Sequence, residues 1–171
     1  PRNRLPVITE IHEWDDDLIY RAINRELDRH GQVYFVHNRV KTIKGMQKVI
    51  EEIVPSARVV VAHGQLPEKQ LENIMLDFIH KKYDVLVSTM IIENGLDIPN
   101  VNTILIDHAD KFGLSQLYQL RGRVGRSDIQ AYAYLLVPHA SRLTDLANKR
   151  LKAIQDFTDL GSGFKVALRD M

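Results

Sequence analysis

Short apolar runs that alternate with segments of helical spacing constrain the fold of this chain more than any other feature. The run Val33 to Val36 is continuously apolar, which is typical of a strand buried on both faces. Similar runs follow at 58–62, 84–88, 103–106 and 131–136, and residues 7–11 alternate like a half-buried strand. Apolar spacing between the runs predicts helices over 15–30, 42–53, 67–81, 115–121 and 141–157.

Strands separated by helices are joined by right-handed crossovers, so we predict an α/β fold with a mostly parallel sheet and helices on both faces. Signals at the helix ends agree with this order: N-cap and first-turn acids at 15–17, a C′ glycine at Gly31, a first-turn proline at Pro67 and an N-cap at Ser141. Ligands of such sheets bind at the carboxyl ends of the strands. We therefore expect functional residues in the loops that follow the strands.

The composition limits the class of protein. With 171 residues, the chain forms one domain or one domain with a short appendage, and its 44% apolar and 26% charged residues are ordinary for a globular protein. It has no run of 18 apolar residues, so we expect no membrane-spanning helix. The absence of cysteine excludes disulfides and cysteine nucleophiles and fits a reducing compartment. The chain begins at Pro1 without an initiator methionine or a signal peptide, and we expect it to be part of a longer protein.

The net charge of +1 conceals an uneven distribution. Residues 1–110 carry 13 Lys and Arg against 17 Asp and Glu, a balance of −4, and residues 111–171 carry 10 against 5, a balance of +5. A basic C-terminal third favours an anionic partner such as phosphate or nucleic acid, although a solvated basic helix surface would give the same balance.

The densest group of candidate functional residues lies at the end of the helix predicted at 115–121. Three arginines and two glycines lie within six residues: Arg121, Gly122, Arg123, Gly125 and Arg126. Adjacent Gly-Arg units disfavour a regular helix and suit a tight loop. Guanidinium groups bind phosphate through two parallel hydrogen bonds and keep their charge. One arginine would be enough to pair with the helix dipole, so the cluster points to an anionic ligand.

A second group follows the strand predicted at 84–88. Ser88 and Thr89 could donate hydrogen bonds to a phosphate, and Gly95 permits a close approach of the backbone. Asp97 could accept a hydrogen bond from a ribose hydroxyl or from an arginine. A plain turn in which Asp97 is a local acceptor explains the same segment equally well.

Other polar motifs carry less information. His63-Gly64-Gln65 follows a predicted strand, and a satisfied loop histidine explains it most simply. Asp107-His108-Ala109-Asp110 looks like an acidic Mg²⁺ motif, but the sequence has no G-x-x-x-x-G-K-[ST] phosphate loop for it to work with. The seven histidines include no H-x-x-x-H pair, so we expect no metal site in this chain.

Together these motifs resemble the second RecA-like domain of superfamily 2 helicases. The matching segments are motif IV at Val33 to Asn38, the H-G-[QR] element at His63 to Gln65, motif V at Ser88 to Pro99 and motif VI at Gln119 to Arg126. The whole chain is similar to one branch, that of the transcription-repair coupling factors and the RecG helicases, which share the stretch Ala109 to Leu117. The stretch Gly31 to Phe35 and the short passage from Val36 to Thr42 favour the coupling factors.

The resemblance implies a RecA-like three-layer αβα sandwich and an ATP site shared between two such domains. The first domain, outside this chain, would supply the phosphate loop and the acids that bind Mg²⁺, so this chain alone is expected to be inactive. Arg123 and Arg126 would act as arginine fingers that stabilise charge on the transferred γ-phosphoryl group. Gln119 would sense the γ-phosphate, and Gly95 and Asp97 would approach the nucleotide.

The resemblance also implies partners. Contacts to the backbone of double-stranded DNA, without readout of sequence, would come from Asn38, His63, Gly64, Ser88 and Thr89. ATP hydrolysis would move the domain along the duplex. RNA polymerase and nucleotide-excision repair proteins would bind other domains of a cytoplasmic bacterial protein that has no membrane contact.

The same resemblance divides the chain in two. Residues 1–138 would form the RecA-like domain, and residues 139–171 would begin a helical hairpin that belongs to a translocation motif. The stretch Ser141 to Phe157 would be the first helix of that hairpin. Arg121 could serve the interface between domains in place of the nucleotide.

Three alternatives stay open. A RecG-type helicase domain acting on branched DNA would carry nearly the same motifs. A RecA-like module that only binds partners predicts lost arginines in motif VI, but Arg123 and Arg126 are both present. A small-molecule α/β enzyme that holds a phosphorylated substrate predicts an acid and base pair near the arginines, and the sequence offers no clear pair.

Overall fold

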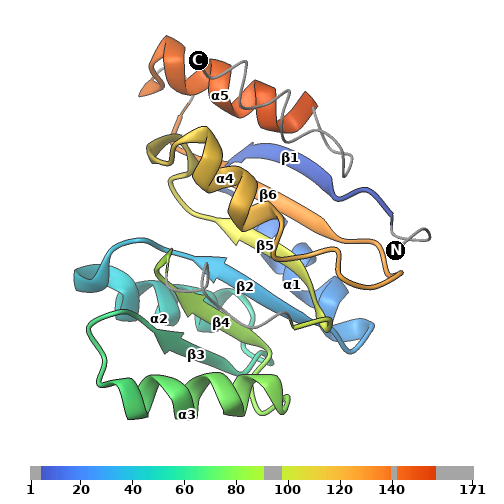
Figure 1. Cartoon of the computed structure of the whole chain (residues 1–171), viewed down its shortest axis with the longest axis vertical. Coiled ribbons are helices and arrows are strands. Elements are labelled where there is room, and N and C mark those ends of the chain that lie inside the picture. The colour runs from blue at the N-terminus through green and yellow to red at the C-terminus, as the bar shows by residue number, and fades with distance from the viewer. Residues whose placement is uncertain (1–4, 91–97, 140–141, 157–171) are drawn as a thin grey trace.

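A six-stranded parallel sheet forms the centre of the molecule (Figure 1). The computed structural model describes residues 5–90, 98–139 and 142–156. The strands are β1 (Ile8–Glu13), β2 (Gln32–Val36), β3 (Val59–Ala62), β4 (Val85–Ser88), β5 (Val101–Ile106) and β6 (Tyr132–Val137). They are arranged in the order β1-β6-β5-β2-β4-β3, and every neighbouring pair is parallel. The predicted parallel sheet is confirmed.

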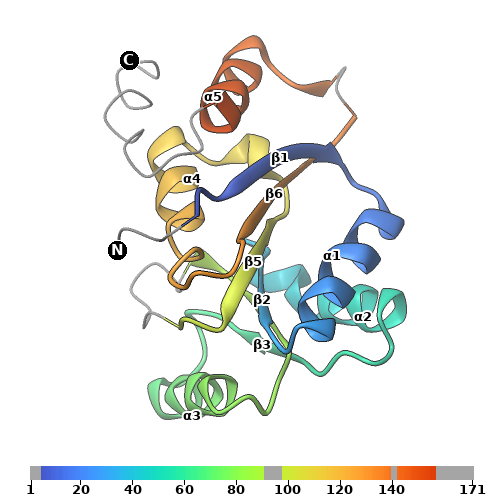
Figure 2. The same cartoon turned by 90° about the vertical axis from the view of Figure 1, so that its right-hand side faces the viewer.

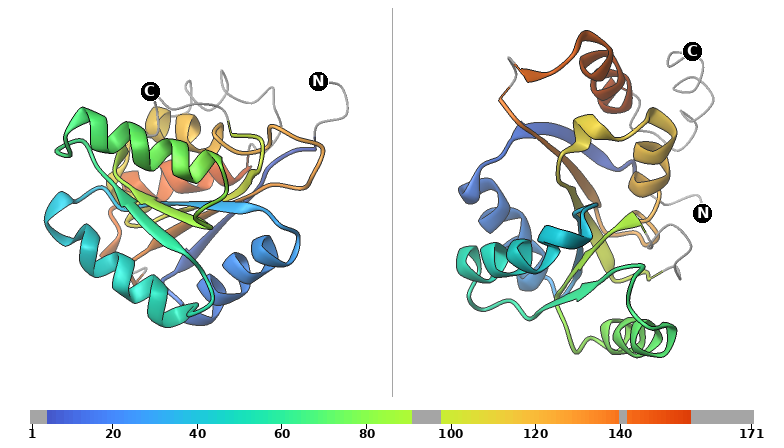
Figure 3. Two further views of the ribbon diagram at one scale, coloured as in Figure 1. Left: turned by 90° about the horizontal axis from the view of Figure 1, so that it is seen from below. Right: turned by 90° about the vertical axis from the view of Figure 1, so that its left-hand side faces the viewer.

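Helices cover both faces of this sheet. The helices α1 (Asp16–Asp28) and α2 (Ile43–Ile53) lie on one face, and α3 (Glu68–Ile79), α4 (Leu114–Arg121) and α5 (Asp145–Asp156) lie on the other (Figures 2 and 3). Two short 3-10 helices, η1 (Val40–Thr42) and η3 (Ala109–Lys111), precede α2 and α4. The predicted three layers are therefore present. In the described part of the chain, no helix is long and apolar enough to cross a membrane.

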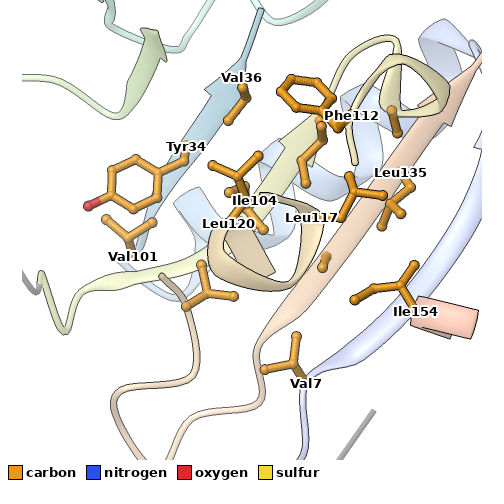
Figure 4. Close-up of a cluster of buried hydrophobic side chains, with 14 of the residues drawn as sticks. Val7, Tyr34, Val36, Val101, Ile104, Phe112, Leu117, Leu120, Leu135 and Ile154 are labelled. Atoms are coloured by element: carbon orange, nitrogen blue, oxygen red, sulfur yellow. The ribbon is translucent and has the colours of Figure 1, made fainter. Parts of the chain in front are cut away.

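The core has one half on each face of the sheet, because successive strand residues point to opposite sides. Along β2, Tyr34 and Val36 join the larger half (Figure 4). This half packs under α3, α4 and α5. Val33 and Phe35 join the smaller half under α1 and α2. All five residues of β2 are buried, which explains why this strand reads as a continuous apolar run.

The N-terminus of α1 agrees with the sequence signals, and its C-terminus differs from them. Asp15 caps the helix, since its carboxylate accepts from the Asp17 amide at 2.9 Å. The left-handed position after the helix belongs to His30, with φ of 61°, and not to Gly31. Gly31 is needed for another reason: a Cβ there would collide with the carboxylate of Glu26, which is fully buried and accepts from Thr103 and Arg29.

The last helix begins later than predicted. Thr144 caps α5, because its hydroxyl accepts from the Ala147 amide at 3.0 Å, and the predicted cap Ser141 lies outside the described residues. Leu151 and Ile154 of α5 belong to the larger core. This helix therefore packs against the same sheet as α4, while the division of the chain at residue 138 stays a prediction.

Candidate functional site

The candidate residues fall into two groups at opposite edges of the sheet. Asn38, His63 and the pair Ser88-Thr89 lie where β2, β3 and β4 end. The arginine cluster lies where strands begin. We refer to these positions as the carboxyl edge and the amino edge of the sheet.

At the carboxyl edge, backbone and side-chain hydrogen bonds tie neighbouring loops together. The Asn38 side-chain oxygen accepts from the Met90 amide at 3.2 Å, and the Thr89 amide donates to the Ala62 carbonyl at 3.4 Å. The His63 Nδ1 accepts a hydrogen bond from the Gln65 amide at 3.2 Å. The three loops that carry the expected DNA contacts are therefore adjacent, as the parallel sheet requires.

The five expected DNA-contact residues differ in their exposure to solvent. Asn38 and Gly64 are exposed and His63 is half-buried, so these three can be reached from solvent. Ser88 is 0% exposed and Thr89 is 7% exposed. The contact of Ser88 and Thr89 with DNA stays a prediction, and among these five candidates the accessible surface belongs to the other three.

The arginine cluster lies at the amino edge, away from the loops that follow the strands, where we expected functional residues. The Ser127 hydroxyl donates to the Asn102 side-chain oxygen near the start of β5 at 3.1 Å, and the Gln130 side-chain amide donates to the Pro6 carbonyl just before β1 at 2.6 Å. The reason is the direction of α4. This helix leaves the carboxyl end of β5 and carries the chain back across the sheet before the loop begins.

Gly125 lets this loop pass close to the start of the sheet. Its φ is +82°, which is a conformation that side chains disfavour, and a Cβ would lie 2.9 Å from Val7 Cγ2. Arg123 and Arg126, on either side of it, are half-buried. Gln119 is exposed on α4. The loop therefore brings two half-buried arginines to one edge, with Gln119 one turn of helix away from it.

Arg121 has a different role from the other two arginines. It is 4% exposed, its Nη1 donates to the Ile154 carbonyl of α5 at 3.1 Å, and its guanidinium lies 4.7 Å from the Tyr118 ring centre. A second arginine bridges the same layer, because Arg150 donates to the Asp110 carbonyl at 3.3 Å. Arg121 therefore joins α4 to α5 inside this domain.

Two predicted nucleotide contacts, Gly95 and Asp97, lie outside the described residues. Asp107, from the motif that looked acidic enough for Mg²⁺, accepts instead from His37 Nδ1 at 2.8 Å. Among the residues that the structure describes, no group of three His, Asp or Glu side chains could hold a metal ion.

The His37–Asp107 pair is the polar feature that sequence reasoning missed. His37 stands next to Asn38 in a loop where functional residues were expected, but its partner, 70 positions away, could not be identified from the sequence. The signal was the strand pattern, because both residues directly follow predicted buried strands. Only the pairing of β2 with β5 turns that pattern into a contact.

Comparison with known proteins identifies the family of this chain. Residues 16–128 match the model of the helicase conserved C-terminal domain. Over all 171 residues the chain is 56% identical to the transcription-repair-coupling factor of Bacillus subtilis (strain 168) and 52% identical to that of Staphylococcus epidermidis. It spans only 14% and 15% of the length of these two relatives.

Solved structures give the same picture. RecG bound to a three-way DNA junction is 35% identical, with a TM-score of 0.82, over 99% of this chain and 22% of that one. The L327V variant of S. cerevisiae Dbp5, bound to RNA and ADP BeF3, is 18% identical, with a TM-score of 0.64, over 91% of this chain and 41% of that one. The second likeness shows the fold alone, and the predicted RecA-like fold is confirmed.

Proposed function

Because this chain belongs to the helicase conserved C-terminal domain family, we propose that it is the second motor domain of an ATP-driven translocase on double-stranded DNA. The observation that carries the proposal is the arrangement of two sets of residues on opposite edges of one sheet, the half-buried Arg123 and Arg126 on one and Asn38, His63 and Gly64 on the other. One set offers fixed positive charge for a nucleotide, and the other offers polar groups for a DNA backbone.

Identity to the coupling factors favours a role in transcription-coupled repair. The chain is 56% identical to one of them along its entire length, against 35% to RecG. In this proposal the full protein displaces stalled RNA polymerase, and its other domains bind the polymerase and the nucleotide-excision repair proteins in the bacterial cytoplasm. Action on branched DNA, as the RecG likeness suggests, is the second candidate.

The nucleotide site in this proposal is composite. The sequence lacks a phosphate loop, so ATP is held with Mg²⁺ by the first motor domain, and Mg²⁺ supplies neutralisation of phosphate charge there. Arg123 and Arg126 fit the remaining task, because guanidinium groups on a loop edge can enter a cleft formed with another domain. They stabilise charge on the γ-phosphoryl oxygens, and Gln119, Gly95 and Asp97 complete the contact.

The DNA contact in this proposal comes from the carboxyl edge. Asn38, His63 and Gly64 present polar atoms and backbone at the surface, and Ser88 and Thr89 support them from the end of β4. Contacts of this kind hold phosphates and sugars and therefore position the motor without reading sequence.

Substitution of Arg126 in the full-length protein tests the composite site. We expect Arg126→Ala to reduce DNA-stimulated ATPase turnover by at least about 10²-fold, which is the low side of arginine-finger effects. Arg21→Ala is the matched control, because Arg21 is exposed on α1 and pairs with Asp17 at 3.1 Å, a contact of little energetic weight. Wild-type turnover by the Arg126 variant would refute the assignment.

Mixing the two motor domains gives a second test. This chain alone should hydrolyse no ATP with duplex DNA present, and adding a separately made first motor domain should restore activity. Hydrolysis by this chain alone would overturn the composite site.

A further inference from the structure

His37 lies in a hydrogen-bonded chain at the carboxyl edge of the sheet, which joins the segments that follow β2 and β5. Its Nδ1 lies 2.8 Å from Asp107 Oδ2, and its Nε2 lies 2.7 Å from the Thr42 hydroxyl. His37 and Asp107 are each 6% exposed. Because a carboxylate only accepts, the Nδ1 carries a hydrogen, and in the neutral ring Nε2 accepts from Thr42.

The sheet register creates this arrangement. Val36 of β2 pairs with Ile106 of β5, so the next residue of each strand, His37 and Asp107, emerges at the same level of the carboxyl edge. Backbone bonds fix both residues: the Asp107 amide donates to the Val36 carbonyl at 2.9 Å, and the His37 amide donates to Ser88 at 2.8 Å.

Each partner of His37 belongs to a different functional element. Thr42 closes the turn 38–42, whose first residue, Asn38, is the exposed DNA-contact candidate that also bonds the Met90 amide. Asp107 opens the connection that runs through η3 and α4 to the arginine loop. A single imidazole therefore fixes the DNA-facing turn against the segment that leads to the proposed ATP site.

We propose that His37 is a positioning residue for DNA engagement, which acts by holding the turn 38–42 against Asp107. This inference rests on the proposed function. His37 is buried and does not reach the surface, but in this proposal it controls how Asn38 contacts the DNA backbone. Loss of the ring frees the turn, so the protein needs more DNA to reach the same rate.

The test uses DNA-stimulated ATPase of the full-length protein, measured against duplex concentration. We expect His37→Ala to raise the DNA concentration for half-maximal stimulation by about fivefold or more, the low end of coupling between sites. Turnover at saturating DNA should fall by less than about twofold, because the arginine loop keeps its own contacts. His80→Ala, at an exposed position after α3, is the matched control.

Conservative variants separate positioning from mere stability. His37→Asn keeps an amide nitrogen near the Nδ1 position to donate to Asp107, and His37→Gln places an amide oxygen near the Nε2 position to accept from Thr42. Each variant should raise the DNA concentration for half-maximal stimulation less than His37→Ala does. The double variant His37→Ala with Asp107→Asn should be no worse than the stronger single variant, because both remove one interaction.

The outcomes are distinct. Unchanged half-maximal DNA concentration in His37→Ala, in a protein whose wild type is stimulated by DNA, overturns the positioning role alone. An equal loss of turnover and of thermal stability, with DNA dependence unchanged, also overturns it and makes His37 structural. A wild-type protein that DNA does not stimulate at all refutes the proposed function itself.

Discussion

Replacing Arg121 should damage stability, in contrast to Arg126, although both arginines belong to the same motif. The Arg121 side chain is buried, donates to the Ile154 carbonyl and lies against the Tyr118 ring. A hydrogen bond from a charged donor contributes about 1.5–3 kcal/mol, and a largely desolvated cation-π contact adds about 0.5–2 kcal/mol. We therefore expect Arg121→Ala to lower the free energy of unfolding by about 2–4 kcal/mol.

Thermal unfolding of this chain measures the effect. For a domain of this size, each kcal/mol corresponds to about 2–4 °C, so the midpoint should fall by roughly 5–15 °C. Arg121→Lys should recover only part of the loss, because one ammonium cannot reproduce a planar guanidinium that both stacks and donates.

The opposite pattern would refute this reasoning. An Arg121→Ala protein that unfolds within about 1 °C of wild type, but whose full-length form has lost ATPase turnover, would place Arg121 at the nucleotide. The separation of roles within motif VI would then be wrong.

Two further predictions concern the arginine loop and the far face of the sheet. Gly125→Ala should lower the free energy of unfolding in urea by about 1–3 kcal/mol, because φ of +82° is strained for alanine and the new methyl meets Val7; an unchanged midpoint would contradict the loop geometry. Burial raises the pKa of Tyr134, which the hydrogen bond from Arg25 only partly opposes. The stability that Tyr134 contributes is therefore complete below its unfolded pKa of about 10 and is lost as pH rises through the higher folded value. Urea unfolding between about pH 9 and pH 12 should show a smaller alkaline loss in Tyr134→Phe than in wild type, and equal losses would rule out this tyrosine as the source.

The strands and helices could be predicted from the sequence because each buried parallel strand is a continuous apolar run. The site was only partly predictable. The pattern located the arginines at the end of α4 but could not show that the helix returns them to the amino edge. Nor could it show that Arg121 points into the protein, since three neighbouring arginines look alike until α5 packs on one of them.

Contacts between residues that are far apart in the chain could not be predicted from the apolar pattern of the sequence. The bond of His37 to Asp107 depends on which strands become neighbours, and strand order is a property of the whole chain. The same holds for Gly31, whose lack of a side chain is required by the carboxylate of Glu26 and not by the helix end.

The all-parallel sheet gives the domain a mechanical property. A pull between the carboxyl and amino edges runs along the strands, so the hydrogen bonds of the five strand pairs are loaded in shear and share the force. Hydrogen bonds that are loaded in shear must break together, so separating the strands takes a larger force than when the bonds open one at a time. The sheet is therefore stiff along its strands, which are about 15–20 Å long, and it can transmit a force from one edge to the other without stretching.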